Sequence, residues 1–154
     1  MPELVSFDLR RCHIGGEFLA KQKFIKRLHG LRVEGVKDIS PVLKAIAEGK
    51  NIEILFLGDN TFSSDDISSI LAMQDLRDLS LVNCSIDNEQ LNRLAALKKI
   101  TRMNLDQCGR LDQSSLETLV KFKNLETLIV PEVLLSDQNE QYLKRRMPNL
   151  RQIR

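Results

Sequence analysis

The 154-residue sequence has few aromatic residues, with six Phe, one Tyr and no Trp. Proteins that bind single-stranded nucleic acid stack successive bases on aromatic side chains, so this scarcity argues against that function. Charge of one sign is also lacking, because 23 basic and 21 acidic residues leave a net charge of +2. Such a balance provides no long-range field for nucleic acid or anionic lipid. We therefore expect neither a nucleic acid nor a membrane as the partner.

Long apolar runs and a disulfide framework are lacking as well. No stretch approaches the roughly 20 consecutive apolar residues of a membrane-spanning helix. The first residues, MPELVSFDLRR, do not follow the basic and then apolar order of a signal peptide. Three cysteines are an odd number, which disfavours complete pairing into disulfides. These features predict a cytoplasmic protein in a reducing compartment.

What the sequence does contain is a repeat. The segment LRDLSLVNC at 76–84 has aliphatic residues at positions 1, 4 and 6 and a cysteine at position 9. Related segments recur every 24 or 25 residues, among them IEILFLGDN and ITRMNLDQC. We therefore predict a single repeat domain over 1–154, with repeats that start near residues 4, 28, 52, 76, 100 and 125 and a truncated repeat at 150.

Each repeat is expected to form a strand followed by a helix. Alternating apolar residues at positions 4 and 6 are typical of a short strand with one buried face. The second half of each repeat changes to helical spacing, as at Ile86, Leu91, Leu94 and Leu97. Residues that favour helix N-termini precede these stretches. They are Ser40 before Pro41, Asp87 three residues before Gln90, the SSDD segment at 63–66, and Ser114 with Ser115.

The LxxLxLxxN/C pattern resembles that of the leucine-rich repeat family over the whole chain. The mixture of Cys and Asn at position 9 is similar to the intracellular ribonuclease-inhibitor-like or cysteine-containing types, whose repeats are slightly longer. The resemblance implies an α/β fold, a right-handed horseshoe-shaped solenoid. Its parallel concave sheet would have about seven strands, with helices on the convex side.

We find no group of residues that predicts catalysis or a cofactor. Cys12, His13 and His29 lack the spacing of a metal site such as C-x2-C. Cys84 and Cys108 occupy position 9, which is expected to point inward, so we predict buried and inert thiols. The Gly pair of HIGGEF lacks the Lys and Ser or Thr of a phosphate-binding loop. We therefore predict no enzymatic activity, no metal and no cofactor.

Binding by a repeat protein is expected at the positions whose side chains point out of the concave sheet. Here these are positions 3, 5, 7 and 8 of each repeat. Phe56 with its aliphatic neighbours and charged surroundings resembles a binding hot spot; the alternative is a residue that serves only to pack on the sheet. The predicted protein-binding residues are Arg10, Arg32, Ile54, Phe56, Asp78, Ser80, Val82, Arg102, Asn104 and Asp106.

The ends of the repeat array suggest a second function. The first strand carries Leu4, Phe7 and Leu9 and is as apolar as an inner strand, so it lacks a polar cap. We expect this N-terminal edge to be covered by self-association or by another chain; the alternative is that the sequence is a fragment of a longer protein. The alternative to concave-face binding is therefore a structural subunit that docks in a larger assembly through its N- or C-terminal end.

Overall fold

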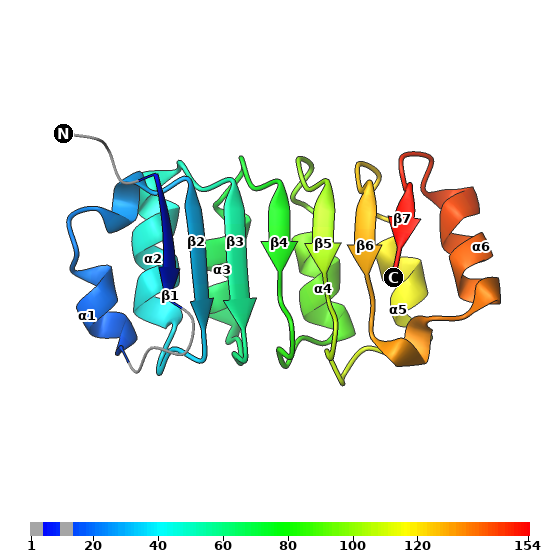
Figure 1. The fold of residues 1–154 in the computed structure, drawn as a ribbon, viewed down its shortest axis with the longest axis horizontal. Coiled ribbons are helices and arrows are strands. Elements are labelled where there is room, and N and C mark those ends of the chain that lie inside the picture. The colour runs from blue at the N-terminus through cyan, green and yellow to red at the C-terminus, as the bar shows by residue number, and fades with distance from the viewer. Residues whose placement is uncertain (1–4, 10–13) are drawn as a thin grey trace.

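The computed structural model describes residues 5–9 and 14–154, and its strands form one parallel sheet (Figure 1). The strands lie side by side in the order of the sequence, from β1 to β7. The sheet therefore grows by one strand per repeat, as a solenoid does. Its strands are β1 (Ser6–Leu9), β2 (Gly30–Glu34), β3 (Ile54–Gly58), β4 (Asp78–Ser80), β5 (Arg102–Asn104), β6 (Thr127–Ile129) and β7 (Gln152–Ile153).

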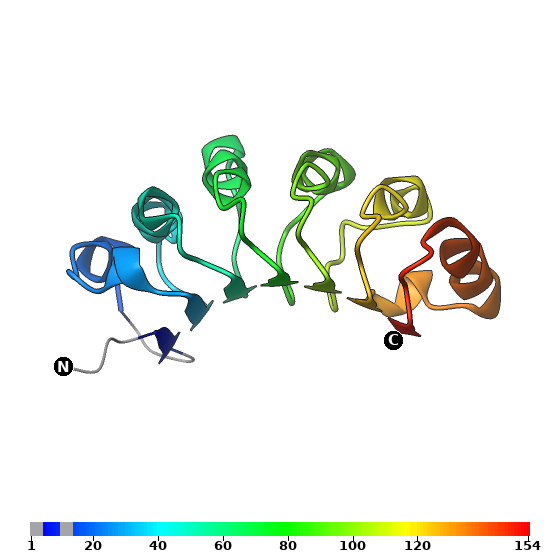
Figure 2. The same ribbon diagram turned by 90° about the horizontal axis from the view of Figure 1, so that it is seen from above.

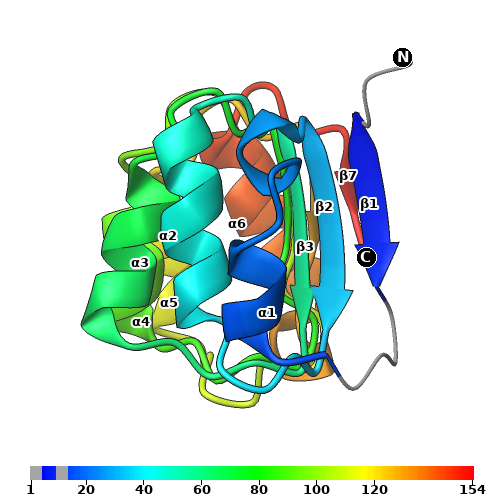
Figure 3. The same ribbon diagram turned by 90° about the vertical axis from the view of Figure 1, so that its left-hand side faces the viewer.

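The helices form a second layer on one face of the sheet (Figures 2 and 3). Seen from above, the two layers follow a shallow arc, with the sheet on the inner side and the helices on the outer side. The predicted fold class, a leucine-rich repeat solenoid with a concave parallel sheet, is confirmed. The helices are α1 (Gly16–Ala20), α2 (Ser40–Gly49), α3 (Ser64–Leu71), α4 (Asn88–Leu94), α5 (Ser115–Leu119) and α6 (Asp137–Arg146), with short 3-10 helices η1 (Ile25–Arg27) and η2 (Glu132–Leu134).

The strand register aligns equal positions of successive repeats. Leu55 lies beside Leu79, which in turn lies beside Met103, and all three are position 4 residues with almost no exposed surface. These side chains point toward the helices, where they form one continuous apolar core with inward residues of the helices such as Ile67 and Leu91. The period of 24 or 25 residues read from the sequence is thus the period of the structure.

Helices begin at all four predicted starts, but only two of the predicted caps form the expected side-chain hydrogen bond. Ser63 and Asp87 are N-caps, each in a complete capping box with the residue three positions later. Ser40 is the first residue of α2, so the N-cap is Ile39 and no side chain caps this helix. Ser114 is the N-cap of α5 but makes no capping hydrogen bond, because its backbone is helical and its hydroxyl is engaged elsewhere. The hydroxyl donates to Asp112 Oδ1 and accepts from Asn88 Nδ2, both at 2.6 Å.

The turn after each inner strand has a left-handed backbone at position 8. The residues there are Gly35, Asp59, Asn83 and Gln107, with φ between 53° and 61°. Glycine adopts this conformation without strain, and Asp and Asn tolerate it better than most other residues. Asn83 Nδ2 also donates to Asp59 Oδ1 at 2.6 Å, which links two successive turns.

Pro131 marks an irregularity, as its sequence position predicts. Strand β6 ends at Ile129, and η2 begins directly after the proline. Position 9 is affected by this change: Val36 in the second repeat is buried, whereas Val133 lies in η2 and is 68% exposed. An inward position 9 therefore holds for the inner repeats but not for the repeat that contains Pro131.

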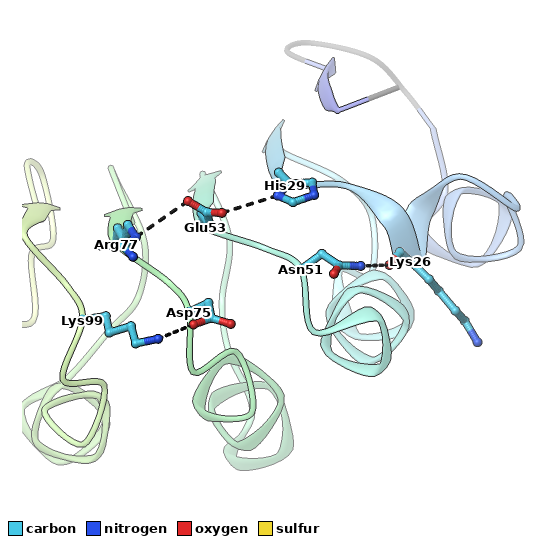
Figure 4. A network of polar contacts seen from close by, with 7 residues as sticks. All are labelled: Lys26, His29, Asn51, Glu53, Asp75, Arg77 and Lys99. Carbon is cyan, nitrogen blue, oxygen red and sulfur yellow. Dashed lines mark hydrogen bonds and ion pairs between the residues drawn. The ribbon is translucent and has the colours of Figure 1, made fainter. Parts of the chain in front are cut away.

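Polar side chains bridge neighbouring repeats near the amino ends of the inner strands (Figure 4). Glu53 lies between His29 and Arg77, with N–O distances of 3.4 and 3.7 Å. On the helix side, Lys99 pairs with Asp75, and this hydrogen bond lowers the pKa of the Asp75 carboxyl. These pairs are half-exposed, so solvent screens them and each is expected to contribute little to stability.

Candidate functional site: the concave face of the sheet

The predicted binding residues form aligned rows on the face of the sheet opposite to the helices. Ile54, Asp78 and Arg102 lie side by side at position 3. Phe56, Ser80 and Asn104 form the parallel row at position 5. These side chains alternate with the buried residues of the same strands, which places them on the concave face.

A groove of about 410 Å³ runs over the middle of this face. Ile54 lies outside it and borders a smaller hollow of about 190 Å³ that shares Arg32 and Phe56 with the groove. Asp106 borders neither, and Arg10 lies outside the described residues. The predicted site residues that line the groove are Arg32, Phe56, Asp78, Ser80, Val82, Arg102 and Asn104.

The groove contains residues that the sequence analysis did not select as binding residues. Most of them occupy positions 3, 5, 7 or 8, so the repeat alignment alone would have identified them as residues of the concave face. Met103 is an exception, because it is a buried position 4 residue and reaches the groove only between the outward side chains. These additional residues are Glu34, Gly58, Asp59, Met103, Thr127 and Ile129.

Phe56 lies in the centre of the concave face, where it is half-buried. The guanidinium carbon of Arg32 lies 4.4 Å from the centre of its ring, in cation–π geometry. This contact joins the neighbouring strands β2 and β3 and restricts the position of the ring. Ile54, on the same face of β3, is 41% exposed. The concave face thus presents apolar surface beside a fixed positive charge.

Asp78 and Arg102 form an ion pair in the groove. Arg102 Nε donates to Asp78 Oδ2 at 2.8 Å, and only 15% of the Asp78 side chain is exposed. In the next row, Asn104 Oδ1 accepts a hydrogen bond from the backbone N–H of Asp106 at 2.9 Å. Both contacts hold polar side chains against the sheet, so a partner would meet a surface that is already ordered.

The cysteines of the inner repeats are buried, as predicted, and lack the setting of a nucleophile. The thiols of Cys84 and Cys108 donate to the carbonyl oxygens of Leu57 and Leu81 at 2.7 and 3.0 Å. Burial raises the pKa of the Cys84 thiol to about 12 and that of the Cys108 thiol to about 11. Since thiolates are the reactive form, both side chains are protonated and inert near neutral pH.

Nothing in the described part of the chain forms a metal site. Groups of three or more His, Cys, Asp or Glu in ligand-like arrangement are absent from residues 5–9 and 14–154. The His29 side chain is exposed, and its Nδ1 lies 3.4 Å from Glu53 Oε1. Cys12 and His13, the other ligands considered from the sequence, lie outside the described residues. Among the described helices, none has the length and apolar character to cross a bilayer.

Comparison with known proteins gives matches of structure. No protein-family model and no curated protein sequence matches the chain. The internalin InlF of Listeria monocytogenes superposes with a TM-score of 0.59 at 17% identity, covering 97% of this chain and 47% of that one. Internalin C2 of the same species gives 0.54 at 16% identity, covering 97% of this chain and 73% of that one.

The chain thus spans about half the length of the first internalin structure. At this level of identity the likeness concerns the fold, and the predicted ribonuclease-inhibitor-like subtype stays a prediction. The period, the strand register and these two superpositions agree on one conclusion. The chain has the fold of a leucine-rich repeat solenoid.

Proposed function

We propose that this chain is a non-enzymatic protein-binding module and that its partner docks on the concave face of the sheet. The observation that carries the proposal is the groove around Phe56, where an aromatic ring lies among ordered charged side chains. Interfaces concentrate their binding energy in such central apolar residues with a polar rim. Solenoids present extended concave surfaces that are generally used for protein binding. A cytoplasmic location, favoured by the composition, is part of the proposal.

The dimensions of the sheet constrain the interface. Seven parallel strands at a spacing of about 4.8 Å span roughly 29 Å. A standard interface buries about 800 Å² on each partner. The concave sheet is close to this area, so the turns at its edges are expected to take part.

Replacing Phe56 by Ala is expected to weaken the complex by more than about 1 kcal/mol, or at least about fivefold, because it removes the central apolar contact. The partner would be identified by co-purification from the native cell with mass spectrometry, then purified for calorimetric titration. Phe18→Ala provides the control, since Phe18 is 65% exposed and lies on α1, away from the concave face. An unchanged affinity with an intact fold would rule out the concave centre.

The second candidate function is docking through the N-terminal end of the array. Val5 is 55% exposed at this end, and Phe7 packs on Phe24 with a ring-centre distance of 4.9 Å while remaining half-exposed. At the opposite end, α6 buries only Asn139 and Leu143 and is otherwise polar. Exposed apolar side chains lie near both ends, with Val133 and Leu135 near the last strand, and self-association would cover the N-terminal edge. A clean monomer in light scattering at high concentration would count against this function.

A further inference from the structure

Among the described residues, those at the carboxyl ends of the strands carry an unbalanced charge. Every charged residue that the structure describes at positions 7 and 8 is acidic, and those on the regular repeats are Glu34, Asp59 and Asp106. Within the described residues none of these three carboxylates forms an ion pair; Arg10 and Arg11, at the same positions of the first repeat, lie outside them. We refer to Glu34, Asp59 and Asp106 as the acidic margin.

The glycine at position 7 of β3 brings one of these carboxylates over the sheet. A β-carbon built on Gly58 would lie 2.9 Å from Glu34 Cγ and 3.6 Å from Glu34 Cδ. The Glu34 side chain therefore lies across β3 in the space that any other residue at 58 would fill. Phe56 precedes Gly58 by two residues on the same face. The negatively charged carboxylate of Glu34 thus lies on the same face of β3 as Phe56.

The positive charges of the groove do not neutralise this margin. Arg102 is paired with Asp78, and Arg32 is stacked on the ring of Phe56. Asp59 accepts a hydrogen bond from the neutral amide of Asn83, which leaves its charge unbalanced. Among the described residues that line the groove, two carboxylates, Glu34 and Asp59, therefore face one cation without an ion-pair partner, Arg32.

On the basis of the proposed function, we propose that the partner inserts a lysine or arginine side chain into this groove, from a segment that also carries an apolar residue. The stem of such a side chain is apolar and fits against Phe56 and Val82. Its cationic head can then form charge-assisted hydrogen bonds with Glu34 and Asp59. The apolar neighbour in the partner would contact Ile54 in the adjoining hollow. The partner class is thus a basic, partly apolar protein segment.

The test uses random peptides displayed on phage and selected on the immobilised chain. We expect the selected peptides that lose binding on Phe56→Ala to be enriched in Lys or Arg next to an apolar residue. One of them, synthesised, should bind about tenfold more weakly to the double variant Glu34→Gln with Asp59→Asn. Both changes keep the side-chain shape, and Asn tolerates the left-handed backbone at 59.

The matched control is Asp65→Asn with Glu89→Gln, which removes the same two charges from exposed positions of the convex helices α3 and α4. Its affinity for the peptide should be unchanged. Equal binding by the groove variant and the wild type, together with loss on Phe56→Ala, would overturn the basic-residue inference and leave the concave-face function standing. Peptides that bind independently of Phe56 would contradict the proposed function itself.

Discussion

Replacing Leu79 by Ala should lower the free energy of unfolding by about 3 kcal/mol, because it leaves a cavity in a core that has few ways to collapse. Leu79 has no exposed surface and lies at the centre of the sheet, between Leu55 and Met103 of the neighbouring strands. Each repeat of a solenoid buries its faces only against its neighbours. Loss of this side chain therefore weakens two interfaces between repeats. Urea denaturation followed by circular dichroism measures the change.

The control for this substitution is Ser80→Ala, one residue further along β4. Ser80 points to the concave face and is half-buried, so its replacement is expected to change the free energy of unfolding by less than about 0.5 kcal/mol. Similar effects of the two substitutions would contradict the assignment of Leu79 to the core and Ser80 to the concave face.

Replacing Gly49 by Ala should also cost about 3 kcal/mol, for a different reason: the added methyl group has no room. Gly49 is the last residue of α2, and a β-carbon there would lie 1.9 Å from the carbonyl oxygen of Lys26. The contacted atom is backbone, so no side-chain rotation relieves the overlap. The same carbonyl accepts a hydrogen bond from Asn51 Nδ2 at 3.1 Å (Figure 4), which a shifted backbone would lose.

Gly109→Ala is the matched control, because no heavy atom lies within 4 Å of the β-carbon position and Gly109 does not have a positive φ. An alanine there restricts the unfolded chain and should leave the stability equal or slightly higher. Thermal melts of the two variants are sufficient to compare them. If both glycines were replaced at the same small cost, the close approach of α2 to the Lys26 carbonyl would be refuted.

The repeat frame was predictable from the sequence because it depends on spacing alone. Aliphatic residues at positions 4 and 6 must share a face of a strand, and the equal period then places Ile54, Asp78 and Arg102 side by side. The inward direction of Cys84 and Cys108 follows from the same alternation. These predictions required only that successive repeats stack in register.

Features that depend on contacts between repeats could not be predicted. Ser114 has the residue type of a helix cap, yet its hydroxyl accepts a hydrogen bond from Asn88 of the preceding repeat and makes no cap. The position of Glu34 over Gly58 depends on which rotamer the neighbouring strand allows. The cation–π contact between Arg32 and Phe56 likewise joins residues 24 positions apart whose side-chain directions are set by packing. A one-dimensional pattern carries no information on these choices.

The most direct test of concave-face binding is hydroxyl-radical footprinting of the chain with and without its purified partner. Ile54 and Phe56 report on the concave face, whereas Val5 and Phe18 are exposed side chains of the first repeat and Leu135 lies near the C-terminal end. We predict that the partner protects Ile54 and Phe56 from oxidation and leaves Val5, Phe18 and Leu135 unchanged. Protection of Val5 and Phe18, with Ile54 and Phe56 as reactive as in the free chain, would contradict concave-face binding and support docking through the N-terminal end.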